Sequence, residues 1–311
     1  MSAADHCIFG WRVRSAIPLP DLLPWDGDAR EPDISIVLGS VPPLTNPSRQ
    51  FSPSVQIGDG VVRVSIPDVA TYLAQGGNRI VVDTELPTAA PDLRVFLLGT
   101  VLAVISFQRS RLPLHASVVE VDGGALVLGG DSGAGKSTMA AAFVRRGFRV
   151  LSDDLCLLDQ GESGPLIQPA YPRLRLWKQT AVHLGLDTTG IERARKSLGK
   201  HHFPVATADF HAAALPPILV VGMGFSDHPS AQVQISPVSQ GMAMRHYFLI
   251  HRWRLGLAMG HQPLFFASMA ELVRHCRVVT LERPRDFALI DEAADRLLDL
   301  ARRGARTGAV A

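Results

Sequence analysis

The sequence predicts an α/β protein in which a small, mostly β region at residues 1–92 precedes a larger α/β domain at residues 93–311. Two observations support this fold class. The first region is rich in Pro, Gly and Asp, and turn residues bound its short apolar runs, which is typical of strands. The second region alternates apolar strand-like segments with longer helix-like segments around one glycine-rich loop, and such alternation indicates an α/β fold.

The N-terminal region contains three segments that the sequence predicts to be strands. Each is a short run rich in Val, Ile and Leu, and glycine-containing turns precede the last two: Ile34–Leu38, Val61–Ile66 and Arg79–Val82. A helix is predicted next, from Leu93 to about Arg109. Its most apolar stretch, Val95–Phe107, is shorter than the roughly 18 residues that a membrane span needs, so we expect a buried helix and no membrane partner.

The glycine-rich loop Gly130–Ser137 lies between a strand pair and a helix. Two strands are predicted before the loop and one after the helix: Ser117–Val121, Ala125–Leu128 and Phe148–Leu151. The helix is predicted at Thr138–Arg146, because two arginines and then Gly147 form a C-terminal stop signal. The order strand, loop, helix, strand predicts a right-handed βαβ unit.

The rest of the chain supplies further elements of the same domain. We predict two buried strands and two helices: Ile218–Val221, Arg277–Leu281, Ala267–His275 and Asp286–Arg303. Gly304 is expected to end the last helix, and Ala305–Ala311 is expected to be a frayed tail.

Charge and cysteine usage argue against several classes of protein. The chain has 31 Lys and Arg against 29 Asp and Glu, so its formal charge of +2 lacks the basic excess of a nucleic-acid-binding protein. Its three cysteines, Cys7, Cys156 and Cys276, are far apart, and no disulfide framework is expected. This cysteine usage fits a reducing cytoplasm, and the N-terminus lacks the basic and apolar pattern of a signal peptide, so we expect a cytoplasmic protein.

The segment Gly130–Ser137 matches the P-loop pattern G-x-x-x-x-G-K-[ST] at every fixed position. Its glycines allow backbone N–H groups to converge on phosphate oxygens, and the following helix adds the positive end of its dipole. Lys136 is predicted to bridge the β- and γ-phosphates of a nucleoside triphosphate, and the Ser137 hydroxyl to bind Mg²⁺. The predicted nucleotide-binding residues are Gly130, Asp131, Ser132, Gly133, Ala134, Gly135, Lys136, Ser137 and Thr138.

Two adjacent carboxylates, Asp153 and Asp154, follow the strand after the loop helix. In P-loop enzymes a Mg²⁺-binding carboxylate occupies this place. A pair allows one carboxylate to hold the metal or its water shell while the other accepts the proton of an attacking hydroxyl. We predict that both are catalytic together with Lys136, and that Asp154 and Ser137 lie at the metal.

Other candidate side chains have more than one interpretation. His115 begins the strand pair before the P-loop, where it could be a packed side chain or a catalytic group. Arg173, Arg175 and the basic run Glu192–His202, which contains Lys200, suggest either a solvated loop or a mobile lid that contacts the substrate. The remaining histidines show no zinc-binding spacing.

Together, the three motifs resemble the HPr kinase/phosphorylase family. That family has a His at a strand start, a G-D-S-G-x-G-K-S loop and an Asp-Asp pair after the next strand, which match His115, Gly130–Ser137 and Asp153–Asp154. The resemblance implies the P-loop fold shared with phosphoenolpyruvate carboxykinases, Mg-ATP as donor, a serine hydroxyl as acceptor and a homo-oligomeric assembly. It also implies that His115 is catalytic and that the Asp pair is the acid/base group next to the metal.

Two departures from the family pattern argue against HPr itself as the acceptor. The family usually has K-S-E where this chain has Lys136–Thr138. Its E-I-R-G signature is replaced by Arg173–Trp177 in the nearest segment, without the Glu that is implicated in metal binding. The chain is more similar to the HPr-kinase-like enzymes of lasso-peptide gene clusters, which phosphorylate the C-terminal serine of a precursor peptide. The resemblance therefore implies an ATP-dependent serine kinase that acts on a peptide or small protein.

Two other functions remain open at this point. A kinase for a free small molecule such as an amino acid needs the same donor site, and a nucleotide-dependent binding or regulatory module needs no acceptor. A signalling GTPase is disfavoured because no Asn-Lys-x-Asp motif occurs, and a transport ATPase because no L-S-G-G-Q-like signature follows the loop.

Overall fold

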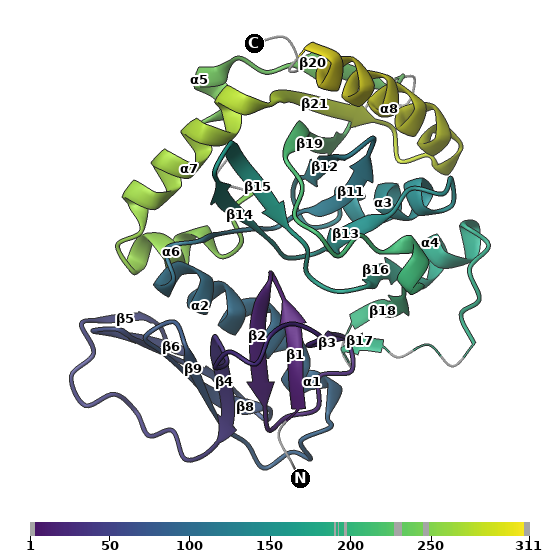
Figure 1. Cartoon of the computed structure of the whole chain (residues 1–311). Coiled ribbons are helices and arrows are strands. Elements are labelled where there is room, and N and C mark those ends of the chain that lie inside the picture. The colour runs from purple at the N-terminus through teal and green to yellow at the C-terminus, as the bar shows by residue number, and fades with distance from the viewer. Residues whose placement is uncertain are drawn as a thin grey trace.

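The computed structural model describes residues 4–189, 191, 193–195, 198–226, 232–244 and 249–307. In Figure 1 the strands of the N-terminal part lie at the bottom, and the elements around the P-loop lie above them. The helix that follows the N-terminal strands lies between these two parts and shares a buried apolar cluster with the N-terminal sheet.

The N-terminal part contains one nine-stranded sheet with the strand order β3-β1-β2-β4-β9-β8-β7-β6-β5. Its strands are β1 (Ala4–Ile8), β2 (Trp11–Ser15), β3 (Leu23–Pro24), β4 (Ile34–Leu38), β5 (Arg49–Ser52), β6 (Val55–Gly58), β7 (Val61–Ile66), β8 (Ala70–Gln75) and β9 (Arg79–Asp83). Buried and partly exposed side chains alternate along β2, β7 and β8, so one face of the sheet carries the core. The three predicted strands are confirmed as β4, β7 and β9. Strands such as β5, which reads Arg-Gln-Phe-Ser, lack an apolar run that could have identified them.

The predicted helix after these strands is confirmed, and it is continuous over 18 residues. It consists of α1 (Pro91–Phe96), a π-helical turn η1 (Leu97–Val101) and α2 (Leu102–Gln108). The Tyr72 hydroxyl of β8 donates to the Leu93 carbonyl over 3.0 Å, which fixes the helix on the sheet. The segment is long and apolar enough to span a membrane by length and composition, but 67% of it is buried within the protein, as in a core helix.

The P-loop part is built on a six-stranded sheet with the order β13-β11-β12-β19-β21-β20. Its strands are β11 (Ser117–Val121), β12 (Gly124–Gly129), β13 (Val150–Asp153), β19 (Pro217–Phe225), β20 (Gln234–Pro237) and β21 (Arg277–Arg283). Helices α3 (Lys136–Val144) and α8 (Ile290–Thr307) share one buried cluster with Val119 and Leu128, while α7 (Gln262–His275) shares another with Val118 and Val127. Because neighbouring residues of a strand face opposite sides, the helices cover both faces of the sheet.

The direction of the strands decides where the functional motifs meet. Strand β11 is antiparallel to both β12 and β13, so β12 and β13 run parallel to each other with β11 between them. The predicted βαβ unit therefore exists, but with one strand inserted that the local pattern did not reveal. Strands β19 and β21 are parallel to β12. The carboxyl ends of four parallel strands thus lie at one edge of the sheet, which is where α/β proteins place their ligands.

Two three-stranded sheets and several short helices complete the fold. The sheets are β10 (Leu112–Leu114), β14 (Cys156–Gly161) and β15 (Gly164–Gln168), and β16 (Arg173–Trp177), β18 (Leu198–Pro204) and β17 (Arg193–Arg195). The helices are α4 (Lys178–His183), α5 (Gln240–Ala243), α6 (Trp253–Ala258), η2 (Thr207–Asp209) and η4 (Phe287–Leu289).

The structure corrects three sequence predictions. The basic run was expected to be a loop or lid, but its described residues form strands β17 and β18; Glu192, Lys196 and Ser197 lie outside the described residues. The strand predicted at Phe148–Leu151 lies at Val150–Asp153 instead. The last helix continues through Gly304 to Thr307, because one glycine costs a helix only about 1 kcal/mol relative to alanine. The predicted frayed tail is therefore helical up to Thr307, and residues 308–311 lie outside the described residues.

A buried ion-pair cluster connects the N-terminal part with the P-loop part. Asp21 lies 3.2 Å from Arg94 of α1 and 2.7 Å from Arg173 of β16. The side chains of these residues are only 12%, 8% and 7% exposed, respectively. One carboxylate thus compensates two buried guanidinium groups.

We expect Asp21→Asn to destabilise the protein by about 3–5 kcal/mol, because it removes the carboxylate that pairs with the buried guanidinium groups of Arg94 and Arg173. Urea denaturation followed by circular dichroism measures this loss. Asp122→Asn is the matched control, since Asp122 pairs with Arg302 over 3.1 Å at the surface, where both side chains are about half exposed. An exposed pair contributes at most about 1 kcal/mol. Equal losses in the two variants would contradict the assigned role of Asp21.

Candidate active site

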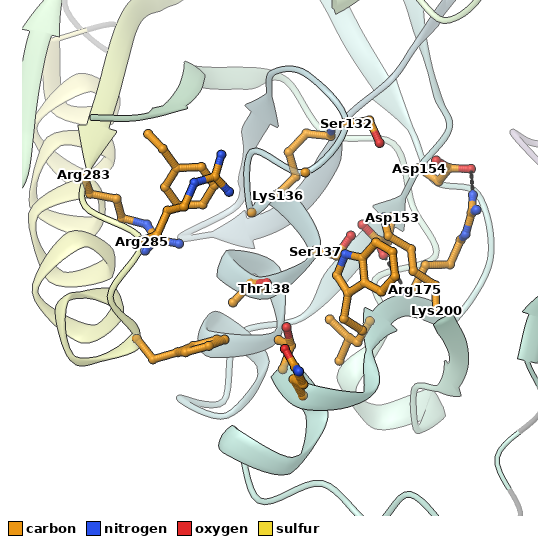
Figure 2. A pocket seen from close by; sticks show the side chains of 18 of the residues that line it. Ser132, Lys136, Ser137, Thr138, Asp153, Asp154, Arg175, Lys200, Arg283 and Arg285 are labelled. Atoms are coloured by element: carbon orange, nitrogen blue, oxygen red, sulfur yellow. Dashed lines mark hydrogen bonds and ion pairs between the residues drawn. The ribbon is translucent and has the colours of Figure 1, made fainter. Parts of the chain in front are cut away.

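The motifs predicted from sequence meet in one cavity of about 460 Å³ at the carboxyl edge of the six-stranded sheet (Figure 2). His115, the Asp pair, Arg175 and Lys200 all reach this cavity. Its lining residues are His115, Ser132, Gly133, Gly135, Lys136, Ser137, Thr138, Asp153, Asp154, Arg175, Leu176, Trp177, Gln179, Thr180, Lys200, Phe225, Arg283, Arg285, Asp286 and Phe287.

Two glycines of the P-loop bring its backbone close to the neighbouring strands. Gly130 and Gly135 have φ angles of +138° and +90°, a region that side-chain-bearing residues rarely adopt. A Cβ atom on Gly130 would lie 2.5 Å from the carbonyl oxygen of Met223, and one on Gly135 would lie 3.1 Å from a guanidinium nitrogen of Arg283. A side chain at either position would therefore push the loop away from β19 and β21.

The loop offers hydrogen-bond donors that the protein leaves unused. The backbone N–H groups of Ser132, Gly133 and Gly135 donate to no acceptor in the described part of the chain. All three residues line the cavity. The first turn of α3, which begins at Lys136, adds the free N–H groups and the positive dipole end of a helix N-terminus. This set of donors fits the phosphate oxygens of a nucleotide.

Lys136 lies over the P-loop and is 7% exposed. Its ammonium group donates to the carbonyl oxygens of Gly130 over 2.8 Å and of Asp131 over 3.1 Å. Burial lowers the pKa of Lys136, and the nearby Asp153 carboxylate offsets this effect in part. Phosphate oxygens at this place would stabilise the charged form of the lysine, so the site fits a triphosphate.

Asp153 is only 2% exposed, and both of its carboxylate oxygens accept hydrogen bonds. The Ser117 hydroxyl donates to one oxygen, and the backbone N–H of Arg175 donates to the other over 2.7 Å. These bonds fix the carboxylate between β11 and β16. Of the two aspartates, Asp153 has the stronger electrostatic effect on Lys136, and Figure 2 draws it beside Ser137.

Asp154 has a different environment. Its φ angle of +96° is unfavourable for a residue with a side chain, and such strain is typical of functional sites. Its carboxylate pairs with the Arg175 guanidinium and lies 3.4 Å from Nδ1 of His115. Burial raises the pKa of Asp154, but the charge of Arg175 and of other nearby groups outweighs burial and holds this pKa well below its usual range. Asp154 is therefore ionised at neutral pH.

His115 is held next to Asp154 by the backbone. Its Nδ1 lies 2.9 Å from the carbonyl oxygen of Asp154, which selects the tautomer with hydrogen on Nδ1 and leaves Nε2 as an acceptor. Its ring centroid is 5.4 Å from that of His251, a residue that the sequence did not single out. Burial lowers the pKa of His115 and lowers that of His251 to about 3. Both imidazoles are therefore neutral at pH 7.

Two of the three predicted substrate residues reach the cavity, and the third does not. Arg175 and Lys200 line the cavity, and the ammonium group of Lys200 lies 5.5 Å from the ring centroid of Trp177. Burial lowers the pKa of Lys200, and the charge of Arg175 lowers it further. Arg173 does not line the cavity, since its guanidinium pairs with Asp21 in the buried cluster. Residues 173 and 175 share a face of β16, yet only the second reaches the site.

One wall of the cavity was missed by sequence reasoning. It contains Phe225 at the end of β19, and Arg283 and Arg285 at and after the end of β21. The only local signal was Arg-Pro-Arg after an apolar strand, and such a signal is common where strands end in solvent. Trp177 and Phe287, which are 46% and 38% exposed, complete the lining, but exposure cannot be read from the sequence.

The oxygen ligands in the cavity could hold Mg²⁺ only together with the phosphates of a bound nucleotide. Within the described residues, no group of three or more His, Cys, Asp and Glu side chains could hold a metal ion. Mg²⁺ needs fewer protein ligands in nucleotide sites, because substrate phosphates and water complete its octahedral shell. Ser137 and the Asp pair lie in the cavity beside the P-loop and provide oxygen ligands of this kind.

Comparison with known proteins gives partial sequence matches to HPr kinase/phosphorylases. No protein-family model matches the chain. It is 38% identical over 81 residues to an HPr kinase/phosphorylase of Limosilactobacillus reuteri, a match that covers 22% of this chain and 25% of that protein. It is 31% identical over 93 residues to an HPr kinase/phosphorylase of Treponema pallidum, covering 30% of this chain and 27% of that protein. The chain thus matches only about a quarter of the length of these relatives.

The solved structure of the Hpr(Ser) kinase/phosphatase from Coxiella burnetii gives a TM-score of 0.30 at 15% sequence identity. That match covers 63% of this chain and 94% of the other. The sequence matches, at 31% and 38% identity, are the stronger finding. Over these segments the chain is similar to HPr kinase/phosphorylases.

Proposed function

We propose that this protein is an ATP-dependent kinase that transfers the γ-phosphoryl group of Mg-ATP to a serine hydroxyl of a peptide or small protein. The observation that carries the proposal is the meeting of the P-loop and the Asp153–Asp154 pair in one cavity. Phosphoryl transfer needs a phosphate cradle and a carboxylate that orients the attacking oxygen, and the position of the P-loop and the Asp pair in one cavity supports these two roles.

On the donor side, the unpaired loop N–H groups and Lys136 would bind the phosphates. Bound Mg²⁺ would neutralise charge on the β- and γ-phosphates. Ser137 is the protein oxygen that we assign to the metal. For the water shell of the metal we choose Asp153 in place of Asp154, which was predicted there from the sequence. Ser117 and the Arg175 backbone fix the Asp153 carboxylate, and it lies beside Ser137 (Figure 2).

On the acceptor side, we assign the role of catalytic base to Asp154. The serine oxygen attacks the γ-phosphorus, the bond from this phosphorus to the β,γ-bridging oxygen breaks, and ADP leaves. The serine proton passes to Asp154 late in the transfer, since the lowered pKa of this residue makes it a weak base. Its main contribution is therefore to hold the hydroxyl in line for attack. Neutral His115 would help to orient the serine hydroxyl by accepting a hydrogen bond from it at Nε2.

The acceptor that we propose is a peptide whose C-terminal residue is the serine, as in lasso precursor peptides. Arg175 and Lys200 support this choice, because they place positive charge in the cavity beside Asp154. A C-terminal carboxylate next to the reacting hydroxyl would pair with such cations. The alternatives are a free amino acid as acceptor and a nucleotide-dependent module without transfer.

The test uses the whole protein with Mg²⁺ and γ-labelled ATP. Three peptides differ only at their last residue: one ends in serine with a free carboxylate, one in serine amide, and one in alanine. We expect label on the first peptide, at least about tenfold less on the amide because the charged hydrogen bonds to its carboxylate are lost, and none on alanine. Label on free serine alone would favour a small-molecule kinase. Nucleotide binding without transfer to any acceptor would favour a regulatory module.

A further inference from the structure

The cavity has a second wall, which the phosphate cradle and the Asp pair do not use. In Figure 2 Arg283 and Arg285 lie on one side of Lys136, whereas Asp154 and Arg175 lie on the other. The order of the strands explains this separation. The strand that leads into the P-loop, β12, has β11 and then β13 with the Asp pair on one side, and β19 and β21 on the other.

Phe225 and Arg283 form a fixed base for this wall. They are register partners at the ends of β19 and β21. Arg283 is 4% exposed and donates to the carbonyl oxygens of Pro284 and Asp286 over 3.2 Å each. Its Nε has no hydrogen-bond partner among the described residues, and another of its nitrogens approaches Gly135 of the P-loop. A buried guanidinium with an unused donor thus lies directly beside the phosphate cradle.

Arg285 forms the exposed part of the same wall. Its guanidinium carbon lies 4.2 Å from the centroid of the Phe225 ring, and that of Arg283 lies 4.9 Å from it. Within the described residues, Arg285 has no ion pair and no hydrogen bond; the Phe225 ring is its one contact of these kinds. Planar guanidinium groups that lie against an aromatic ring offer a flat surface, and nucleobases stack on such surfaces.

We propose that Phe225 and Arg285, supported by Arg283, form the stacking platform for the base of the nucleoside triphosphate. This inference rests on the proposed donor site, because the triphosphate in the P-loop fixes where the nucleoside can lie. The reacting γ-phosphate must face Asp154, so the nucleoside extends to the opposite side, toward β19 and β21. Phe287, whose ring stacks on His183 at 4.3 Å, provides a further aromatic surface in the cavity.

If this platform binds the base, substitutions in it should weaken the binding of ATP but not the binding of a triphosphate that lacks a base. We compare ATP with inorganic tripolyphosphate, both with Mg²⁺, by isothermal titration calorimetry of the whole protein. Arg285→Lys keeps the charge but removes the planar group, and Phe225→Leu keeps an apolar side chain but removes the ring. Each variant is expected to bind ATP about tenfold more weakly, because stacking on a base contributes roughly 1–3 kcal/mol. Affinity for tripolyphosphate should change less than twofold.

Arg254→Lys is the matched control. Arg254 also lies against an aromatic ring, 5.2 Å from the centroid of Trp253, but it does not line the cavity, so both affinities should stay unchanged. Equal weakening of both ligands by Arg285→Lys and Phe225→Leu would overturn the platform and make this wall a phosphate contact. Unchanged ATP affinity in both variants would overturn it as well. If the wild-type protein binds neither ligand, the donor site itself is wrong, and this outcome is distinct from the other two.

Discussion

Lys136→Met is expected to reduce phosphoryl transfer by about a thousandfold, because removal of one charged donor to a transferring group costs roughly that much. Methionine keeps an unbranched side chain of nearly the same length and removes the ammonium group with its charge and its donors. The fold should tolerate this change, since the ammonium group donates to the carbonyl oxygens of Gly130 and Asp131 and lies in the cavity rather than in the core. Single-turnover transfer of labelled phosphate measures the effect, and thermal unfolding checks the fold.

Lys178→Met is the control for this substitution. Lys178 begins α4 next to the site, but its exposed side chain does not line the cavity. We expect this variant to keep wild-type transfer within about twofold, since surface substitutions away from a site have small effects. A folded Lys136→Met protein with normal transfer would refute the proposed donor site.

Asp154→Asn is expected to lower kcat by about 10²- to 10⁴-fold with little change in the KM for ATP, since the neutral amide holds the serine hydroxyl in line less firmly than the carboxylate does and cannot accept its proton. Asp153→Asn should differ in kind. Both oxygens of Asp153 already accept hydrogen bonds, from Ser117 and from the backbone of Arg175, and an amide can accept only one of them, so Asp153→Asn should lose about 1–3 kcal/mol of stability at any pH. The stability that Asp154→Asn loses comes from its ion pair with Arg175, and this difference from the wild type should disappear at acid pH. Steady-state kinetics and urea denaturation of the two variants separate the roles of the two carboxylates.

Asp159→Asn provides a matched substitution outside the cavity. Asp159 also pairs with an arginine, Arg111, at 2.6 Å, and its side chain is 18% exposed, close to the 21% of Asp154. Transfer should be unaffected by this change. If Asp159→Asn and Asp154→Asn slowed transfer equally, the assignment of Asp154 as the base would be wrong.

The sign of the pH dependence of Asp154 follows from its environment. Folding lowers the pKa of this carboxyl, so its ionisation stabilises the folded state above the unfolded pKa of about 4, and this contribution is lost as the pH falls through the folded pKa. Stability measured by denaturation should therefore fall on the acid side more steeply in the wild type than in Asp154→Asn. Because Asp154 is already ionised near neutral pH, its titration should not change the rate of phosphoryl transfer in that range.

The parts of the proposed donor site could be located from the sequence because they are local. The loop Gly130–Ser137, the helix after it and the Asp pair occupy one continuous stretch, and each has its own residue pattern. The acceptor half could be predicted only in part. Arg175 and Lys200 reach the cavity, but Arg173, two residues from Arg175, compensates Asp21 in a buried cluster instead. A run of basic residues carries no information about which charge a distant carboxylate will neutralise.

Sequence alone determined the α/β class, the apolar helix before the glycine-rich loop, and the position of that loop between a strand and a helix. All of these depend on periodicity and spacing within about 20 residues, which the chain itself encodes. Only the tertiary structure decided that β11 lies between β12 and β13, that His251 lies beside His115, and that Phe225 and Arg283 face the P-loop. These contacts depend on which strands pair across long sequence separations. Burial of both faces of a sheet selects that pairing, and no single segment specifies it.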